Sequence, residues 1–234
     1  MNKEQLKKDI FPAELMLQLF RDIPDVESKI RMVNEYIEKV HGVYDEDVLL
    51  IKQQNQIAHI YWISEQHEQS IHHFEIVVES MEVEDYPSLY FLALNLLIRG
   101  NRILSNYKAA EKWVALAFES SGIFNPAENL INLNDYADLL TESGKVFENK
   151  HMPLIQSIID EYGFPEKLED PITTIRSMRK SYQYWARKLG EMELKSAESS
   201  LTDNILAYEN YTKSCEIGWF RNYASNSLDR LKSK

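Results

Sequence analysis

The fold is decided by residues 89–118, which read LYFLALNLLIRGNRILSNYKAAEKWVALAF. The first half places leucines at helical spacing, and the second half places apolar residues at i, i+3, i+4, i+7 and i+8. Ser105-Asn106-Tyr107 separates the halves as a tight corner. The pattern predicts a hairpin of two helices, which needs similar neighbours to bury both apolar faces. The apolar positions are Leu89, Leu92, Leu96 and Leu97, then Ala110, Trp113, Val114, Ala117 and Phe118.

The composition of the 234-residue chain favours a helical, soluble protein. Hydrophobic residues make up 44% and charged residues 27%, which is ordinary for a globular domain. Seven glycines and seven prolines are too few for a β-sandwich or a glycine-rich nucleotide fold. The formal net charge of −11 argues against nucleic acid as a partner, because phosphate binding requires an excess of Lys and Arg. It suits solubility or a basic protein partner.

Cellular location is indicated by what the sequence lacks. The single cysteine, Cys215, excludes an internal disulfide and favours a reducing compartment. It follows a helical pattern, so we expect a small buried residue and not a catalytic thiol. The N-terminal residues do not resemble a signal peptide, and no run of about 18 apolar residues occurs. We therefore expect a cytoplasmic protein with no membrane partner.

Helix boundaries follow from capping residues, proline and glycine along the chain. Residues 1–22 form a short amphipathic piece with Leu15, Met16, Leu19 and Phe20 on one face. Pro24 opens a helix that Gly42 ends, and Pro87 opens the hairpin described above. No alternating Val, Ile and Thr runs predict a sheet. Further helices are expected at 47–65, 68–81, 125–142, 146–162 with a kink or late start at Pro153, 172–198, 203–217 and 219–233.

These helices predict one all-α domain over residues 1–234, without a compositional break that would mark a linker. N-terminal helices occupy residues 1–44, repeated hairpins occupy 45–218, and a capping helix occupies 219–234. The last helix carries Trp219, Phe220, Tyr223 and Leu228, so it either caps the array or pairs with another copy. The oligomeric state stays open.

Three hairpins in the middle of the chain align with one another. Ala58, Ile98 and Ala137 take equivalent places in the first helices, 40 and 39 residues apart. A small–large–small pattern follows in the second helices, which tightly crossed antiparallel helices require. It comprises Ser70, Phe74 and Val77 in one hairpin and Ala110, Val114 and Ala117 in the next.

On these residues the chain resembles the tetratricopeptide repeat (TPR) family, whose unit is two helices in about 34 residues. The resemblance covers residues 48–218, with longer spacing and without the family's aromatic at Gln54 and Leu94. It implies a right-handed superhelix, an α-solenoid of antiparallel hairpins, whose concave groove binds a peptide or protein segment, and it implies no chemistry. The matching residues are Ala58, Tyr61 and Phe74, then Ala110 and Ala117, then Ala137, Leu140 and Gly144, with 207–215 as the second helix of a fourth unit.

Asparagine recurs at one position of the alignment, as Asn55, Asn95 and Asn134. An amide side chain matches the donor and acceptor of a peptide backbone, so a ladder of amides in the groove would hold an extended segment. The competing interpretation is that these residues pack between helices, and Trp62 has the same two interpretations. Other expected partner contacts on this face are His59, Trp62, Arg99, Arg102 and Asp138.

A histidine cluster, His67, His72 and His73, invites a metal interpretation. A zinc helix needs histidines at i and i+4, whereas a spacing of five turns His72 about 140° away from His67. We therefore expect no metal and no cofactor, and we expect these histidines at the surface or packed in a corner.

The segment 172–198 alternates basic and aromatic residues, a pattern able to bind anions or an acidic partner. The alternative is a helix whose aromatics face the core while its basic side chains extend outward. The residues concerned are Arg176, Arg179, Lys180, Arg187 and Lys188, with Tyr182, Tyr184 and Trp185.

The sequence thus predicts a non-catalytic protein–protein interaction module: an adaptor, a chaperone or a peptide-sensing regulator. One alternative is an immunity protein that neutralises a toxin, such as a basic nuclease, because the chain is small and acidic. Another is an all-α enzyme whose site includes His67, Glu68 and His72 or the basic helix. A structural scaffold is a further alternative.

Overall fold

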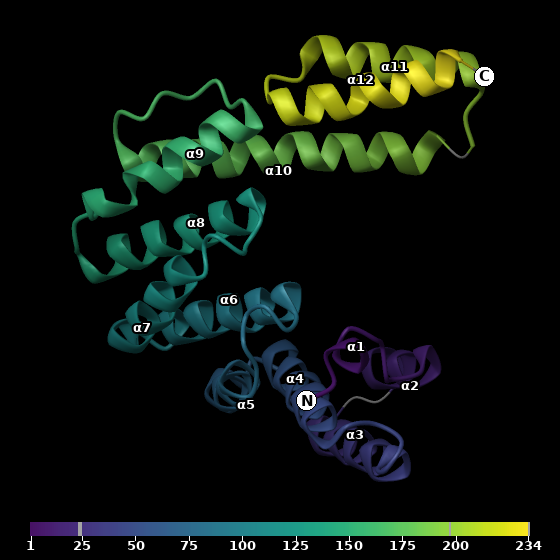
Figure 1. Cartoon of the computed structure of the whole chain (residues 1–234), viewed down its shortest axis with the longest axis vertical. Helices are drawn as coiled ribbons and strands as arrows, with labels where there is room; N and C mark the ends of the chain where they lie inside the picture. The colour runs from purple at the N-terminus through teal and green to yellow at the C-terminus, as the bar shows by residue number, and fades with distance from the viewer. Residues whose placement is uncertain (23–24, 197, 234) are drawn as a thin grey trace. The chain divides into compact units, whose positions relative to one another are not determined.

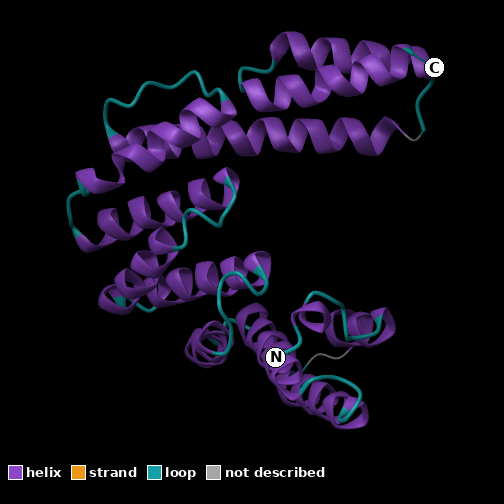
Figure 2. Cartoon of the chain, in the orientation of Figure 1, coloured by secondary structure: helices purple, strands orange, loops and turns teal. Residues whose placement is uncertain are grey.

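The computed structural model describes residues 1–22, 25–196 and 198–233, and the regular structure in these ranges is helical (Figures 1 and 2). The prediction of an all-α protein is therefore confirmed. The chain forms two compact units, Met1–Asn125 and Pro126–Lys234. The boundary falls at the helix start that Asn125-Pro126 marks in the sequence. Each unit is described by itself.

Unit 1 begins with short helices and continues with longer ones. The Asp45 carboxylate caps α4 by accepting from the N–H groups of Asp47 and Val48, and Asp25 caps α3 in the same way through Ser28. The predicted opening of α3 at Pro24 lies outside the described residues. The elements are α1 (Lys3–Leu6), α2 (Ala13–Leu17), a π-helical turn (Gln18–Asp22), α3 (Val26–Val40), α4 (Glu46–Ile63), α5 (His67–Glu79), α6 (Pro87–Ile103) and α7 (Tyr107–Glu119).

Close helix packing in unit 1 rests on small residues, as the small–large–small pattern predicts. The Ser70 hydroxyl of α5 donates to the Ala58 carbonyl of α4 at 3.0 Å, and both residues are fully buried. Gly100 of α6 does the same for the contact with α5, because a Cβ there would lie 2.9 Å from Cγ1 of Ile71. The large residues Phe74 and Val114 are buried beside these contacts.

The two hairpins of unit 1 turn in the same way, 40 residues apart. Glu65 and Ser105 both adopt left-handed backbone, with φ of 58° and 59°. The same backbone hydrogen bond, from an N–H group to the carbonyl five residues earlier, closes each corner. It joins Gln66 N to Tyr61 O at 2.9 Å and Asn106 N to Asn101 O at 2.7 Å. In unit 2, Gly144 (φ 69°) and a bond from Lys145 N to Leu140 O of 2.9 Å give the same corner 39 residues later.

One part of the predicted apolar stripe is wrong. Leu89, Leu96 and Leu97 are buried, but Leu92 is 40% exposed. Helix α6 packs on α5 and α7, so its buried residues spread over two faces and a single stripe does not describe them.

Unit 2 is a smaller set of helices in which α11 and α12 lie along α10 (Figure 1). The Tyr211 hydroxyl of α11 donates to the Trp185 carbonyl of α10 at 2.9 Å. Cys215 is 2% exposed, as predicted for a small buried residue. No described helix in either unit has the length and apolar character needed to cross a bilayer. The elements are α8 (Pro126–Ser143), a 3₁₀ turn (Asn149–His151), α9 (Met152–Tyr162), α10 (Pro171–Ser196), α11 (Leu201–Ser214) and α12 (Gly218–Lys232). Helix α9 starts late, as predicted, with Pro153 in its first turn.

The close approach of α5 and α6 predicts that Gly100→Ala lowers the free energy of unfolding. Overpacking against Ile71 costs about 1–3 kcal/mol, and the better helix propensity of alanine offsets about 1 kcal/mol of that cost. Urea unfolding followed by circular dichroism measures the net change.

The matched control is Gly190→Ala in α10, where a Cβ meets no atom within 4 Å among the described residues. This substitution gains about 0.5–1 kcal/mol from helix propensity alone. Equal stabilisation by both substitutions would contradict the tight contact at Gly100.

Candidate functional site

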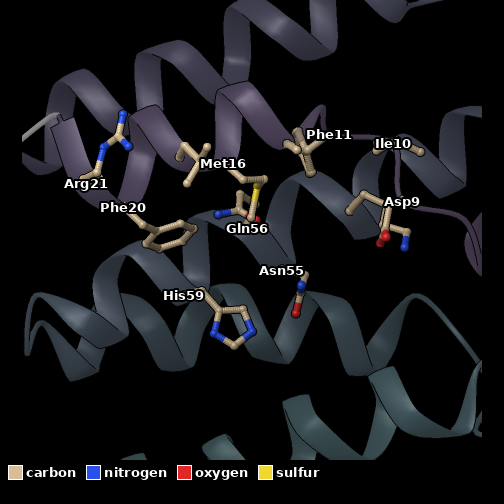
Figure 3. Close-up of a pocket in the computed structure, with 12 residues that line it drawn as sticks. Asp9, Ile10, Phe11, Met16, Phe20, Arg21, Asn55, Gln56 and His59 are labelled. Carbon is tan, nitrogen blue, oxygen red and sulfur yellow. The ribbon is translucent and has the colours of Figure 1, made fainter. Parts of the chain in front are cut away.

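A cavity of about 1120 Å³ lies in unit 1 between the N-terminal segment and α4 (Figure 3). Two groups of side chains line it, one from the N-terminal segment and one from α4. The first group is Asp9, Ile10, Phe11, Ala13, Met16, Leu17, Phe20 and Arg21, and the second is Lys52, Asn55, Gln56 and His59.

The N-terminal segment is held on unit 1 by both apolar and polar contacts. Leu6, Ile10 and Leu19 are at most 3% exposed. The Tyr36 hydroxyl donates to the Ile10 carbonyl at 2.6 Å, and the Asp45 N–H donates to the Gln5 side chain at 2.8 Å. The segment is therefore a fixed wall of the cavity.

The apolar lining comes mostly from the N-terminal segment. The predicted amphipathic face divides at the π-helical turn: Leu19 enters the core, whereas Phe20 is 42% exposed and lines the cavity. Leu17 also lines it and is 54% exposed. Because exposed large apolar side chains in a concave site favour ligand contact, this wall suits an apolar group.

The opposite wall is one polar face of α4. Its residues occupy the i, i+3, i+4 and i+7 positions, which lie along one side of a helix. Figure 3 shows Asn55, Gln56 and His59 from this helix, with Met16 and Phe20 from the N-terminal segment across the cavity. The repeat pattern predicts Asn55 and His59 as partner contacts, but it does not predict Lys52 and Gln56. Their spacing from the selected residues was the signal that could have found them.

Two amides on this wall have an unpaired buried atom. Gln56 is 5% exposed, and its Nε2 has no hydrogen-bond partner among the described residues. The Asn55 Oδ1 is also buried without such a partner. A buried amide atom without a hydrogen bond costs about 1–3 kcal/mol. Both atoms are shielded from solvent, so a side-chain rotation toward the cavity would let them donate to and accept from a ligand.

Burial also lowers the pKa values of the other two residues on this wall. Burial lowers the pKa of His59, whose ring packs edge-on to Phe74 at 5.2 Å, and keeps the imidazole neutral near pH 7. Burial lowers the pKa of Lys52, while the Asp9 carboxylate acts in the opposite direction. The Arg21 guanidinium pairs with Asp22 at 2.6 Å, so the lining holds no uncompensated cluster of one sign.

The other predicted contacts of unit 1 lie outside the cavity lining. Asn95 is 4% exposed, which fits the interpretation that this asparagine packs between helices. Trp62 is half-buried, with its ring 5.0 Å from that of His67. Arg99 and Arg102 are half-buried on α6.

The predicted contacts of unit 2 bind to one another and to the basic helix. The Asn134 amide donates to Asp138 at 3.2 Å, and the Arg176 guanidinium of α10 pairs with the same carboxylate at 3.2 Å. On α10, Trp185 is buried while Lys188 lies over its ring at 5.0 Å. Trp185 thus faces the core, as the interpretation of an outward basic face expects, whereas Tyr184 is 42% exposed with Lys188 4.7 Å over its ring.

The histidines of α5 pack against neighbouring side chains. His73 Nδ1 lies 2.5 Å from Gln54 Oε1, and its ring stacks on Tyr61 at 5.5 Å. Within the described part of the chain, no three His, Cys, Asp or Glu side chains gather in a way that could hold a metal ion.

Comparisons of this chain with protein-family models, with curated proteins and with solved structures each found no match. The geometry of the site is therefore the basis for its functional interpretation.

The attachment of the N-terminal segment predicts a pH-dependent effect of Asp85→Asn. The Lys3 ammonium, 2.6 Å away, is the main cause that lowers the pKa of Asp85, and the Glu82 N–H also donates to this carboxylate. A lowered carboxyl pKa contributes stability above its unfolded value of 3.8, and that stability is lost as the pH falls through the folded value. Asp85→Asn therefore lowers the urea midpoint at about pH 7, and its difference from wild type shrinks progressively as the pH falls below 3.8.

The matched control is Glu84→Gln, which changes the same charge at an exposed neighbouring position. A difference between Asp85→Asn and wild type that is independent of pH would contradict a role for the ionised carboxylate.

Proposed function

We propose that this chain is a non-catalytic binding module that takes an extended segment of a partner protein into the cavity of unit 1. The observation that carries the proposal is the pair of amide side chains, Asn55 and Gln56, that line a cavity with an apolar wall and each hold one buried, unpaired atom. A peptide group supplies the matching donor and acceptor. The apolar wall would take the large side chain next to that peptide group.

The amides favour an extended segment over the face of a helix. In a helix the backbone N–H and C=O groups bond to one another, so few remain for Asn55 and Gln56. An extended chain presents both groups and alternates its side chains, so one side chain enters the cavity while the next points away.

The repeated corner at Glu65 and Ser105 supports a TPR-like organisation of the hairpins of unit 1. In this proposal Asn55 and His59 remain partner contacts, together with Lys52 and Gln56. The cavity replaces the ladder of three asparagines, because Asn95 is buried and Asn134 donates to Asp138 within unit 2. Adaptor, peptide-sensing and immunity roles all use binding of this kind.

If Gln56 serves ligand binding and destabilises the fold, the substitution Gln56→Leu should stabilise the protein and weaken peptide binding. Leucine has a similar volume and removes the unpaired Nε2, so the free energy of unfolding rises by about 1 kcal/mol. Urea unfolding measures this change, and the same variant loses affinity for a cavity-binding peptide.

Gln53→Leu is the matched control, since Gln53 lies on the same helix outside the cavity lining and donates to Asn34 at 2.8 Å. This substitution leaves peptide affinity unchanged. Destabilisation by Gln56→Leu would show that the Gln56 amide has a structural partner. The proposal would then lose the unpaired Nε2 atom on which it rests.

Selection from a displayed library of random peptides tests the binding mode. Peptides enriched on wild type share one large apolar residue, and Ala13→Trp reduces their affinity at least tenfold because the indole fills the cavity. Glu14→Trp, one residue along α2 and outside the lining, is the matched control. The proposed site would be contradicted if both variants lost the same peptide affinity. It would also be contradicted if the selected peptides bound Ala13→Trp as tightly as wild type.

A further inference from the structure

A second pocket, of about 370 Å³, lies within unit 2 between the end of α9 and the start of α12. Two glycines hold these helix ends together: Gly218 N donates to Gly163 O at 3.1 Å, and a Cβ on Gly163 would lie 3.2 Å from the Gly218 Cα. Gly163 also has φ of 61°, which a side chain would strain. The pocket is therefore built on a fixed backbone contact, and nothing in the proposed function of unit 1 uses it.

Aromatic rings form one side of this pocket. Trp219 and Tyr223, one turn apart on α12, are 44% and 42% exposed and stack with ring centroids 5.8 Å apart. The Tyr162 ring lies 5.7 Å from that of Trp219. The Tyr223 hydroxyl donates to Glu193 at 2.9 Å, which fixes this ring. Exposed faces of Trp and Tyr attract cations, because the face of an aromatic ring is electron-rich.

Two carboxylates form the other side. Asp160 and Glu161 are exposed in the last turn of α9, a turn that holds no basic residue. The C-terminal end of a helix is its negative end, where acidic side chains are unfavourable and cations are favourable. The Gln156 amide donates to Asp160 Oδ1 at 2.9 Å, so one carboxylate is oriented by its own helix. The arrangement has a local charge conflict that a bound cation would relieve.

We propose that this pocket binds an arginine side chain of a partner protein. A planar guanidinium lies flat on Trp219 or Tyr223 while its N–H groups donate to Asp160 or Glu161. A lysine ammonium matches the charge but not the flat stacking surface. The net charge of −11 favours the approach of a basic partner surface.

A titration with a blocked amino acid tests this site directly. The probe is N-acetyl-arginine amide, which has the charge and backbone of an arginine within a chain. The readout is the indole N–H signal of Trp219 in nitrogen-15 NMR spectra, assigned with Trp219→Phe. We expect a saturable shift of this signal by the arginine probe and none by N-acetyl-citrulline amide, its neutral isostere.

The double variant Asp160→Asn with Glu161→Gln removes the acidic side and is expected to abolish the shift. The double variant Glu198→Gln with Asp229→Asn changes the net charge by the same amount at residues outside the pocket lining. We expect this variant to retain the shift of the Trp219 signal. The proposal is overturned by equal shifts from the arginine and citrulline probes, by an unchanged shift in the first variant, or by no shift at all. Tighter binding of free L-arginine than of the blocked amide would overturn the assignment to a protein partner.

Discussion

The structure of unit 1 depends on how closely α4 and α5 approach each other at Ala58 and Ser70. The hydroxyl of Ser70 reaches the Ala58 carbonyl at 3.0 Å, a distance that larger side chains at this crossing would prevent. This contact fixes one face of α4, and Leu49, Ile57 and Ile60 join the core shared with the N-terminal segment and α3. The remaining face carries Lys52, Asn55, Gln56 and His59 and forms the polar wall of the cavity.

Much of the fold follows from local sequence signals. Proline and glycine marked the ends of α6, α8 and α9, and the 40-residue repeat appears in the backbone as matching corners at Glu65 and Ser105. These features depend on a few neighbouring residues, so the sequence alone carries them. The exposure of Leu92 does not follow from local sequence signals, because it depends on which faces of α6 the neighbouring helices cover.

The candidate site was predictable only in part, for a related reason. The repeat alignment predicted Asn55 because asparagine recurs at its position, and His59 because it lies one turn along the same face. It also predicted Asn95, which is buried. Lys52 and Gln56 share the face of Asn55, yet only the packing of the N-terminal segment makes them part of a cavity that Met16 and Phe20 also line. Contacts between segments far apart in the sequence carry no local periodicity, so the cavity had no sequence signature. The aromatic side of the unit 2 pocket was visible as Trp219 and Tyr223, but its acidic side became apparent only once α9 met α12.

The central claim is that the amides of Asn55 and Gln56 are kept for a peptide group. The most direct measurement is the proton chemical shift of the side-chain amide of Gln56, recorded with and without a library-selected peptide. We predict a downfield shift for Gln56 on binding, as a new hydrogen bond forms, and no change for Gln53 on the same helix. A bound peptide that leaves the Gln56 signal in place would contradict the account.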